Sequence, residues 1–427
     1  MTMDTQAFHQ RTAEALAALY TNRDQAPEGW REILAWHWEQ AGAYGEAVDA
    51  ALEVAEMRVS ELAFTEALRW VERVLALLDR LSNLERRAYE MRAYSLTIMV
   101  LEFGGQYREA LGYARLLLRL AEERGNVEAQ GHSFLLLGRI QREIGRLAAA
   151  EAELLRAIDL AERHELFELM AETRLHLAKV HQLQGRHLEA FQQLELAQDL
   201  SQDDYARLAR VCTGIGDVYR VLGAGREALR LYHRALKLEI GTSNCLGQAM
   251  LYEKLALSHL ELDQIGAALQ CAQEALRIRD DLNDRVGQAR SQTILGTVQR
   301  RLENFSQALQ HFEYARALEQ GLQNQRGLII ALTNIGDTSR LLHNDERARA
   351  SYIEALALAH DLNDHIALAR MHERLGDLSR KENFIEAARA HWKEALNIRE
   401  TLNHSDECIR LRQRIMSVAV PDQPQSE

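Results

Sequence analysis

Small residues recur at fixed intervals along most of this chain, and this periodicity constrains the fold more than any other feature. A first column of glycine and alanine has members about 40 residues apart, with one slightly shorter step. A second column, always alanine, follows 12 residues later, and a third, also always alanine, follows after another 7. The first column consists of Gly138, Ala178, Gly216, Ala256, Gly296, Gly336 and Gly376. Three columns that stay in step over seven repeats indicate a genuine internal repeat.

The columns predict pairs of antiparallel helices joined by short turns. A small residue is needed where two such helices cross closely, because a larger side chain holds the backbones apart. Glycine within a helix costs about 1 kcal/mol relative to alanine, so its recurrence at one position requires a packing reason. Gly145 and Gly185 stand where a first helix should end. We expect Asn304, Asn344 and Asn383 to replace glycine at this corner, since asparagine tolerates left-handed geometry next best.

The composition supports an all-α chain. Ala, Leu, Glu, Gln and Arg dominate, β-branched residues are sparse, and only 3 of the 427 residues are proline. Between hairpins the sequence Leu-Asn-Asp recurs at 282–284 and 362–364, and its aspartate is expected to cap the following helix. Stacked hairpins of this kind coil into a superhelix, so the chain is predicted to be a helical solenoid.

The small-residue columns resemble those of the tetratricopeptide-repeat (TPR) family. The resemblance covers eight hairpins over about residues 87–401, and it is clearest in LGTVQRRLENFSQALQHFEYARAL (295–318) and IGDTSRLLHNDERARASYIEALAL (335–358). Two features depart from the family: the period is about 40 rather than the usual 34, and the inter-repeat proline is absent. The resemblance implies an all-α, right-handed superhelical solenoid of antiparallel helix hairpins. The long period is similar to that of bacterial peptide sensors and transcription regulators, and of peptide-binding polarity scaffolds.

Both ends of the chain depart from the repeat. The segment 1–85 has shorter helical patterns, in which Ala47 and Ala67 lie much closer together than the members of one column. This segment resembles the junction that follows the nucleotide-binding part of bacterial signalling ATPases, which implies the TPR sensor region of such a protein or a stand-alone relative. The expected organisation is an irregular N-terminal helical segment with TPR-like hairpins at 1–85, eight hairpins at 86–401, a capping helix at 402–418 and a disordered tail at 419–427.

Charge and motifs exclude several classes of function. The formal net charge of -12 disfavours direct nucleic-acid binding, because arginines are interleaved with acidic residues rather than clustered. The sequence shows neither a long apolar run nor a secretory leader, so we expect no membrane association and a cytoplasmic location. The four cysteines are scattered, as expected for reduced thiols. Phosphate-loop, H-E-x-x-H and G-x-S-x-G motifs are absent, so we expect no catalytic residue, cofactor or metal and no enzymatic activity.

Charged residues recur on one face of the first helices, which line the concave face of such a superhelix. Five of the seven residues four positions past the first column are arginine, and aspartate directly follows the small residue in three repeats. Each aspartate is expected to pair with the arginine three residues later, because both lie on one helix face. The candidate partner-binding residues are Asp217, Arg220, Thr297, Arg300, Asn334, Asp337, Arg340, Asp377 and Arg380.

Two interpretations of these columns remain open. In one, the charges form surface ion pairs, each worth a few tenths of a kcal/mol. In the other, the arginines present planar guanidinium groups to carboxylates or carbonyls of a bound peptide, and Asn334 offers an amide to its backbone. Leu257 and Leu260 occupy these positions in the middle repeat and predict an apolar stripe there. Such a groove would suit an amphipathic or extended peptide with acidic residues at one end.

We therefore expect a non-catalytic scaffold or sensor that holds a protein or peptide segment in the concave groove of the superhelix. The alternative is an architectural module that forms homo-oligomers through its end or face helices. Mass in solution at several concentrations would distinguish the two, because only the second requires association.

Overall fold

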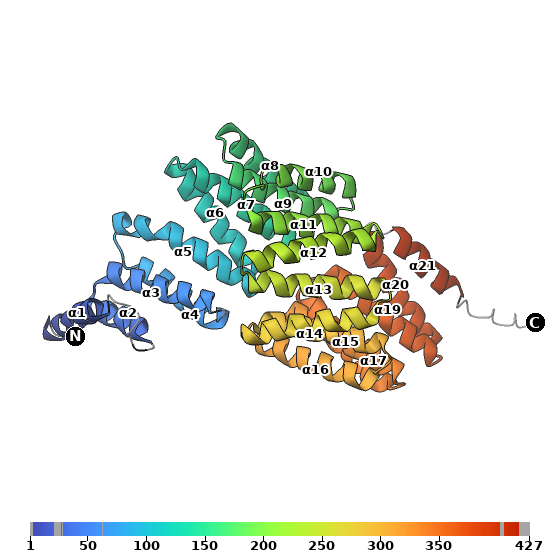
Figure 1. The fold of residues 1–427 in the computed structure, drawn as a ribbon. Coiled ribbons are helices and arrows are strands. Elements are labelled where there is room, and N and C mark those ends of the chain that lie inside the picture. Colours follow the sequence, from blue (N-terminus) through green and yellow to red (C-terminus); the bar gives the residue numbers. More distant parts are fainter. Residues whose placement is uncertain (1–2, 21–26, 28, 62, 402–404, 418–427) are drawn as a thin grey trace, which may run out of the picture. The chain divides into compact units, whose positions relative to one another are not determined.

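The computed structural model describes residues 3–20, 27, 29–61, 63–401 and 405–417. Within these ranges all regular structure is α-helical, in 21 helices (Figure 1). None of the described helices is both long enough and apolar enough to cross a membrane. The chain divides into two compact units, residues 1–244 and residues 245–427. Each unit has its own stack of helices.

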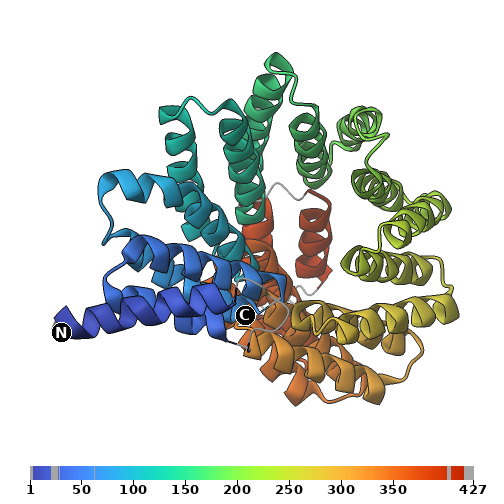
Figure 2. The same ribbon diagram turned by 60° about the vertical axis from the view of Figure 1, so that its left-hand side comes forward.

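The first unit packs its helices in chain order, each against the next (Figure 2). The helices before the regular repeats are α1 (Met3–Leu19), α2 (Trp30–Ala41), α3 (Tyr44–Ser60) and α4 (Phe64–Leu78). The hairpins that follow are α5 (Asn83–Phe103) with α6 (Tyr107–Glu123), α7 (Val127–Ile144) with α8 (Leu147–Arg163), α9 (Phe167–Leu183) with α10 (His187–Asp199), and α11 (Tyr205–Val221) with α12 (Gly225–Gly241).

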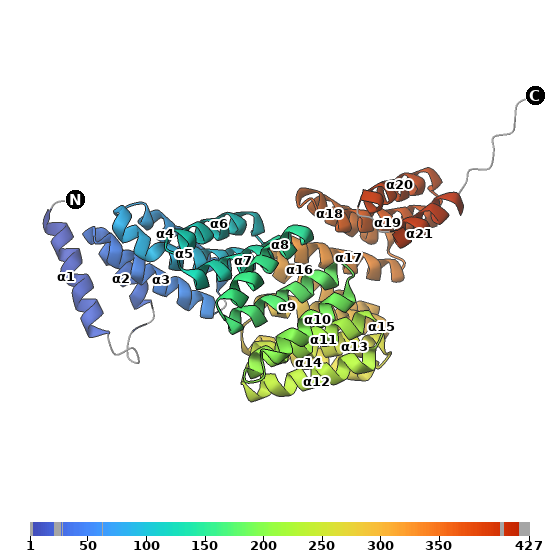
Figure 3. The ribbon, with the colours of Figure 1, turned by 90° about the horizontal axis from the view of Figure 1, so that it is seen from above.

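The second unit continues the same arrangement (Figure 3). Its hairpins are α13 (Cys245–Glu261) with α14 (Ile265–Asp281), α15 (Arg285–Arg301) with α16 (Phe305–Gly321), α17 (Gln325–Leu341) with α18 (Asp345–Asp361), and α19 (His365–Lys381) with α20 (Ile385–Thr401). A last helix, α21 (Ser405–Ser417), packs on α20. The predicted all-α fold of helix hairpins is confirmed. The expected tail at 419–427 lies outside the described residues.

Aspartate side chains cap first helices where the sequence predicted them. The Asp284 carboxylate accepts a hydrogen bond from the backbone N–H of Gly287 at 2.9 Å, and Asp364 accepts one from Ala367 at 3.0 Å. These bonds satisfy N–H groups that lack a partner within the helix. They fix the residues at which α15 and α19 begin.

The turns differ in one respect from the prediction. Asn383 has a positive φ of 67°, as expected, but Asn304 and Asn344 do not adopt this conformation. The left-handed residues in those two turns are Glu303 and His343, one position earlier. Asparagine instead follows the turn as the N-cap residue of the second helix. The Asn344 side chain caps that helix by accepting a hydrogen bond from the backbone N–H of Arg347 at 3.0 Å, whereas the Asn304 side chain forms no cap hydrogen bond.

A ring from the second helix explains the glycines of the first column in the second unit. A methyl group added at Gly296 would lie 2.5 Å from the Phe312 ring, and one at Gly376 would lie 2.6 Å from Trp392. Neither ring can approach so closely without shifting, so glycine is needed there. The crossing thus pairs each glycine with a large side chain 16 residues later, an arrangement that the small columns alone did not predict.

Candidate functional site

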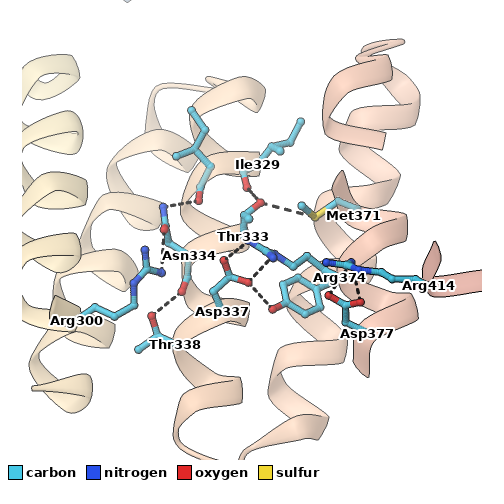
Figure 4. A network of polar contacts seen from close by, with 12 residues as sticks. Arg300, Ile329, Thr333, Asn334, Asp337, Thr338, Met371, Arg374, Asp377 and Arg414 are labelled. Carbon is cyan, nitrogen blue, oxygen red and sulfur yellow. Dashed lines mark hydrogen bonds and ion pairs between the residues drawn. The ribbon is translucent and has the colours of Figure 1, made fainter. Parts of the chain in front are cut away.

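The first helices α15, α17 and α19 of the second unit enclose a recess of about 260 Å³. Its lining combines apolar side chains with three arginines and one aspartate. The lining residues are Arg300, Ile329, Ile330, Thr333, Asn334, Asp337, Ala367, Arg370, Met371 and Arg374. Figure 4 shows the polar residues that connect the three helices across this recess.

Asp337 is the centre of the polar network. Its Oδ1 accepts a hydrogen bond of 2.7 Å from the Tyr352 hydroxyl, and its Oδ2 accepts one of 3.0 Å from Arg374 Nη2 (Figure 4). Burial, together with the charge of Asp337, raises the pKa of Tyr352, so this hydroxyl stays protonated and donates. The carboxylate therefore joins its own hairpin to the next one.

Arg300 reaches the recess from α15. Its Nη1 donates to Asn334 Oδ1 at 3.2 Å, and its guanidinium carbon lies 5.5 Å from the centre of the Phe312 ring. Among the described residues no carboxylate forms an ion pair with Arg300. Burial lowers the pKa of Arg300; Asp337 opposes this effect, whereas the charge of Arg374 adds to it. A second cation, Arg370, is exposed at the edge of the recess and likewise has no ion-pair partner among the described residues.

The prediction that each aspartate pairs with the arginine three residues later is wrong in the second unit. Asp337 forms its ion pair with Arg374, and Asp377 forms one with Arg414 of α21, with an N–O distance of 3.0 Å. Each aspartate also accepts a hydrogen bond from an aromatic side chain on the second helix of its own hairpin. For Asp377 the donor is the Nε1–H of Trp392, at 3.1 Å. Each aspartate therefore contacts the second helix of its own hairpin and the helix that follows that hairpin, rather than a residue of its own helix.

Asp217 has the equivalent place in the first unit. Its Oδ1 accepts a hydrogen bond of 2.7 Å from the Tyr232 hydroxyl, and its Oδ2 lies 3.6 Å from Lys179 Nζ on the preceding first helix. Burial and the charge of Asp217 together raise the pKa of Tyr232. The aspartate column therefore has a packing role in three repeats, since in each one it holds the ring that fills the space beside the glycine.

The nine candidate residues fall into three groups. Those that line the recess are Arg300, Asn334 and Asp337. Those on the same helices but outside its lining are Thr297, Arg340, Asp377 and Arg380. Those on α11, in the other unit, are Asp217 and Arg220.

Of the two leucines expected to form an apolar stripe in the middle repeat, only Leu257 lies at the surface. Leu260 is buried and packs in the core between α13, α14 and α15, so it does not reach the surface. Leu257 is exposed, together with Leu246 and Met250 earlier on α13. These three residues follow the i, i+4, i+11 pattern of one helix face.

Sequence reasoning missed the recess residues Arg370 and Arg374. They stand six and two positions before Gly376, whereas only the positions after each small residue were considered. Positions -6, -2 and +1 lie three or four residues apart and so share one helix face. Extending the same count toward the N-terminus of each first helix would have found both arginines, and Ile330 with them.

Comparisons with known proteins identify repeats in both units. Models described as "Tetratricopeptide repeat" match residues 131–164 and 247–319. No curated protein matches the chain.

The solved structures that match this chain include the following three. BtubC (BKLC) from P. vanneervenii is 20% identical, and the match covers 52% of this chain and 92% of that chain with a TM-score of 0.43. A Rap protein complexed with competence and sporulation factor is 12% identical, with coverages of 88% and 98% and a TM-score of 0.48. The APC/C hetero-tetramer Cut9–Hcn1 is 15% identical, with coverages of 96% and 84% and a TM-score of 0.49.

Proposed function

Because this chain is a tetratricopeptide-repeat protein, we propose that it is a non-catalytic scaffold whose second unit holds a partner segment on the recess between α15, α17 and α19. Stacked helical repeats provide extended binding surfaces of this kind. The observation that carries the proposal is Arg300, a half-buried cation that lies among lining residues and has no ion pair with a described carboxylate. A bound carboxylate would supply the missing charge.

The recess favours a particular ligand chemistry. Its lining holds three arginines against the single carboxylate of Asp337, which is already bonded to Arg374 and Tyr352. Ile330, which is 51% exposed, offers an apolar contact beside these charges. An acidic segment with apolar side chains next to its carboxylates therefore complements the recess in charge and polarity.

The recess is also organised before a ligand binds. Arg300 is held on one side by Asn334 and packs over the Phe312 ring on the other, so its guanidinium group has little freedom to lose. Charge-assisted hydrogen bonds to such a fixed group are the stronger kind, worth about 1.5–3 kcal/mol when they replace contacts with water. Arg370, at the exposed edge, would contribute less because water screens it.

A pair of labelled peptides tests the proposal on the full chain. The acidic probe is a short fluorescein-labelled peptide of leucines and glutamates, and the basic probe replaces every glutamate with lysine. We expect the acidic probe to bind, and the double variant Arg300→Gln/Arg370→Gln to weaken its Kd by about tenfold or more in fluorescence anisotropy. Arg301→Gln is the matched control, because Arg301 is exposed and pairs with Asp263 outside the recess.

Two results would contradict the proposal. One is an acidic probe that binds the double variant as tightly as it binds the natural chain. The other is an acidic probe that does not bind the natural chain at millimolar concentration, while circular dichroism shows that the chain is folded.

A further inference from the structure

The second helix α10 is shorter than its counterparts in the first unit. It has 13 residues, whereas α8 and α12 each have 17. The connection from α10 to α11 (200–204) is two residues longer than that from α8 to α9 (164–166), so the net result is a step of 38 rather than 40 residues from Ala178 to Gly216. Four residues are about one helical turn. Close to this shortened end, Phe167 and Leu196 are 56% and 44% exposed.

Three recesses adjoin one another around these two side chains. The first is about 470 Å³ and lies between the end of α8, the start of α9 and α10. The second, about 480 Å³, shares Glu165 and Phe167 with it and extends to the start of α7. The third, about 580 Å³, shares Leu196 and Asp199 with the first and continues along α10. We refer to these three recesses, which share lining residues, together as the Phe167 groove.

The floor of the Phe167 groove is apolar. Leu169 and Met170 are buried beneath it, and Leu166 and Leu200 are partly covered. An exposed phenylalanine over an apolar floor is costly in water, because a folded chain normally removes such surface from solvent. All of these residues come from one unit, so the groove is complete within residues 1–244.

The rim of the groove carries excess negative charge. Its two arginines are already paired: Arg174 donates to Glu162 at 2.8 Å, and Arg207 lies 3.1 Å from Asp204. Five other lining carboxylates are exposed or half-exposed and form no ion pair or side-chain hydrogen bond with any described residue. These five are Glu128, Glu165, Glu168, Glu195 and Asp199.

We propose that the Phe167 groove docks a basic amphipathic segment of a protein partner. Apolar side chains of the segment would cover Phe167 and Leu196, and flanking lysines or arginines would meet the five carboxylates. Nucleic acids and membrane surfaces are anionic, so the same carboxylates would repel them. This second surface goes beyond the proposed function, since it lies in the other unit and selects the opposite charge.

The same two probes test this proposal on the full chain. We expect the basic probe to bind and the acidic probe to leave this surface empty. The variant Phe167→Ser/Leu196→Ser should weaken the basic probe by about tenfold, since an aromatic and an aliphatic anchor are removed. The variant Glu165→Lys/Glu168→Lys should weaken it similarly, and added salt should weaken it further. Both variants change residues at the surface, and thermal melts monitor their folding.

Matched controls separate the groove from general surface effects. Phe384→Ser removes a similarly exposed phenylalanine from the second unit, and Glu189→Lys inverts an exposed carboxylate at the opposite end of α10. Neither should change binding of the basic probe. Arg300→Gln/Arg370→Gln should also leave it unchanged, so a failure of the acidic site and a failure of this groove give different results.

Three results would overturn the inference. The first is a basic probe that does not bind at millimolar concentration or that binds no better than the acidic probe. The second is binding that is unaffected by the Phe167→Ser/Leu196→Ser change. The third is a dimer of the natural chain that this change dissociates, since the groove would then be occupied by a second copy.

Discussion

The first helices of the two units use the same repeat positions in different ways. In the first unit two arginines at these positions are paired within the protein: Arg142, four residues after Gly138, donates to Glu143 at 3.1 Å, and Arg210 donates to Glu172 at 2.6 Å. In the second unit Arg300 and Arg370 form no ion pair with a described carboxylate. An arginine at an equivalent position is therefore ion-paired within the protein in the first unit and lacks an ion pair with a described carboxylate in the second.

One position explains much of the difference. Glu172 and Arg210 both stand six residues before the small residue of their first helices, and they pair across α9 and α11. The equivalent residues on α17 and α19 are Ile330 and Arg370. Isoleucine cannot accept a hydrogen bond, so Arg370 lacks the carboxylate that its counterpart Arg210 has. The residue on the neighbouring helix thus decides whether an arginine has a carboxylate as an ion-pair partner.

Placing a carboxylate at position 330, which is equivalent to Glu172 of the first unit, should have the largest effect on binding of the acidic probe. In Ile330→Glu the new carboxylate would reach Arg370 across the recess and compete with an acidic ligand for the cations. We expect the acidic probe to bind about 100-fold more weakly, through loss of one charge-assisted contact and repulsion by the added charge. Fluorescence anisotropy measures the change.

Ile330→Gln is the matched control for that change, because it removes the same apolar contact without adding charge. It should weaken the acidic probe only severalfold. Equal losses in Ile330→Glu and Ile330→Gln would show that the apolar contact alone matters, and the comparison between the units would then not explain ligand selection.

The ion pair between Glu172 and Arg210 in the first unit should make the stability of the fold depend on pH. His176 and Arg210 hold the pKa of Glu172 at about 2 despite its burial, whereas the ordinary value is 4.5. A carboxylate with a lowered pKa in the folded state stabilises the fold above pH 4.5, and this contribution is lost as the pH falls through about 2. Glu172→Gln should therefore unfold more easily at pH 7, by about 1–3 kcal/mol, and the difference should vanish near pH 2.

Denaturant unfolding of the natural chain and of Glu172→Gln between pH 2 and pH 7 measures this difference. Glu168→Gln serves as control, because Glu168 lies one turn away, is exposed and has no ion pair among the described residues. A Glu172→Gln penalty that stays constant over this pH range would contradict the assigned role of the ion pair.

The sequence predicts the hairpins well because small residues at helix crossings are a local requirement that recurs in every repeat. It predicts the charged partners poorly because they belong to the next hairpin. Asp337 was expected to pair three residues away but binds Arg374, 37 residues along the chain. The relative rotation of neighbouring helices sets such contacts, and the spacing within one helix does not reveal it.

The smallest effect concerns the arginine column itself. Arg300 and Arg380 are equivalent in the sequence, four residues after Gly296 and Gly376, yet only Arg300 lines the recess. Arg380 is exposed at the end of α19, where water screens its charge. We expect Arg380→Gln to change the Kd of the acidic probe by less than about twofold, and Arg300→Gln alone to weaken it severalfold. Equal effects of the two substitutions would mean that the whole column attracts the ligand and that the recess confers no selectivity.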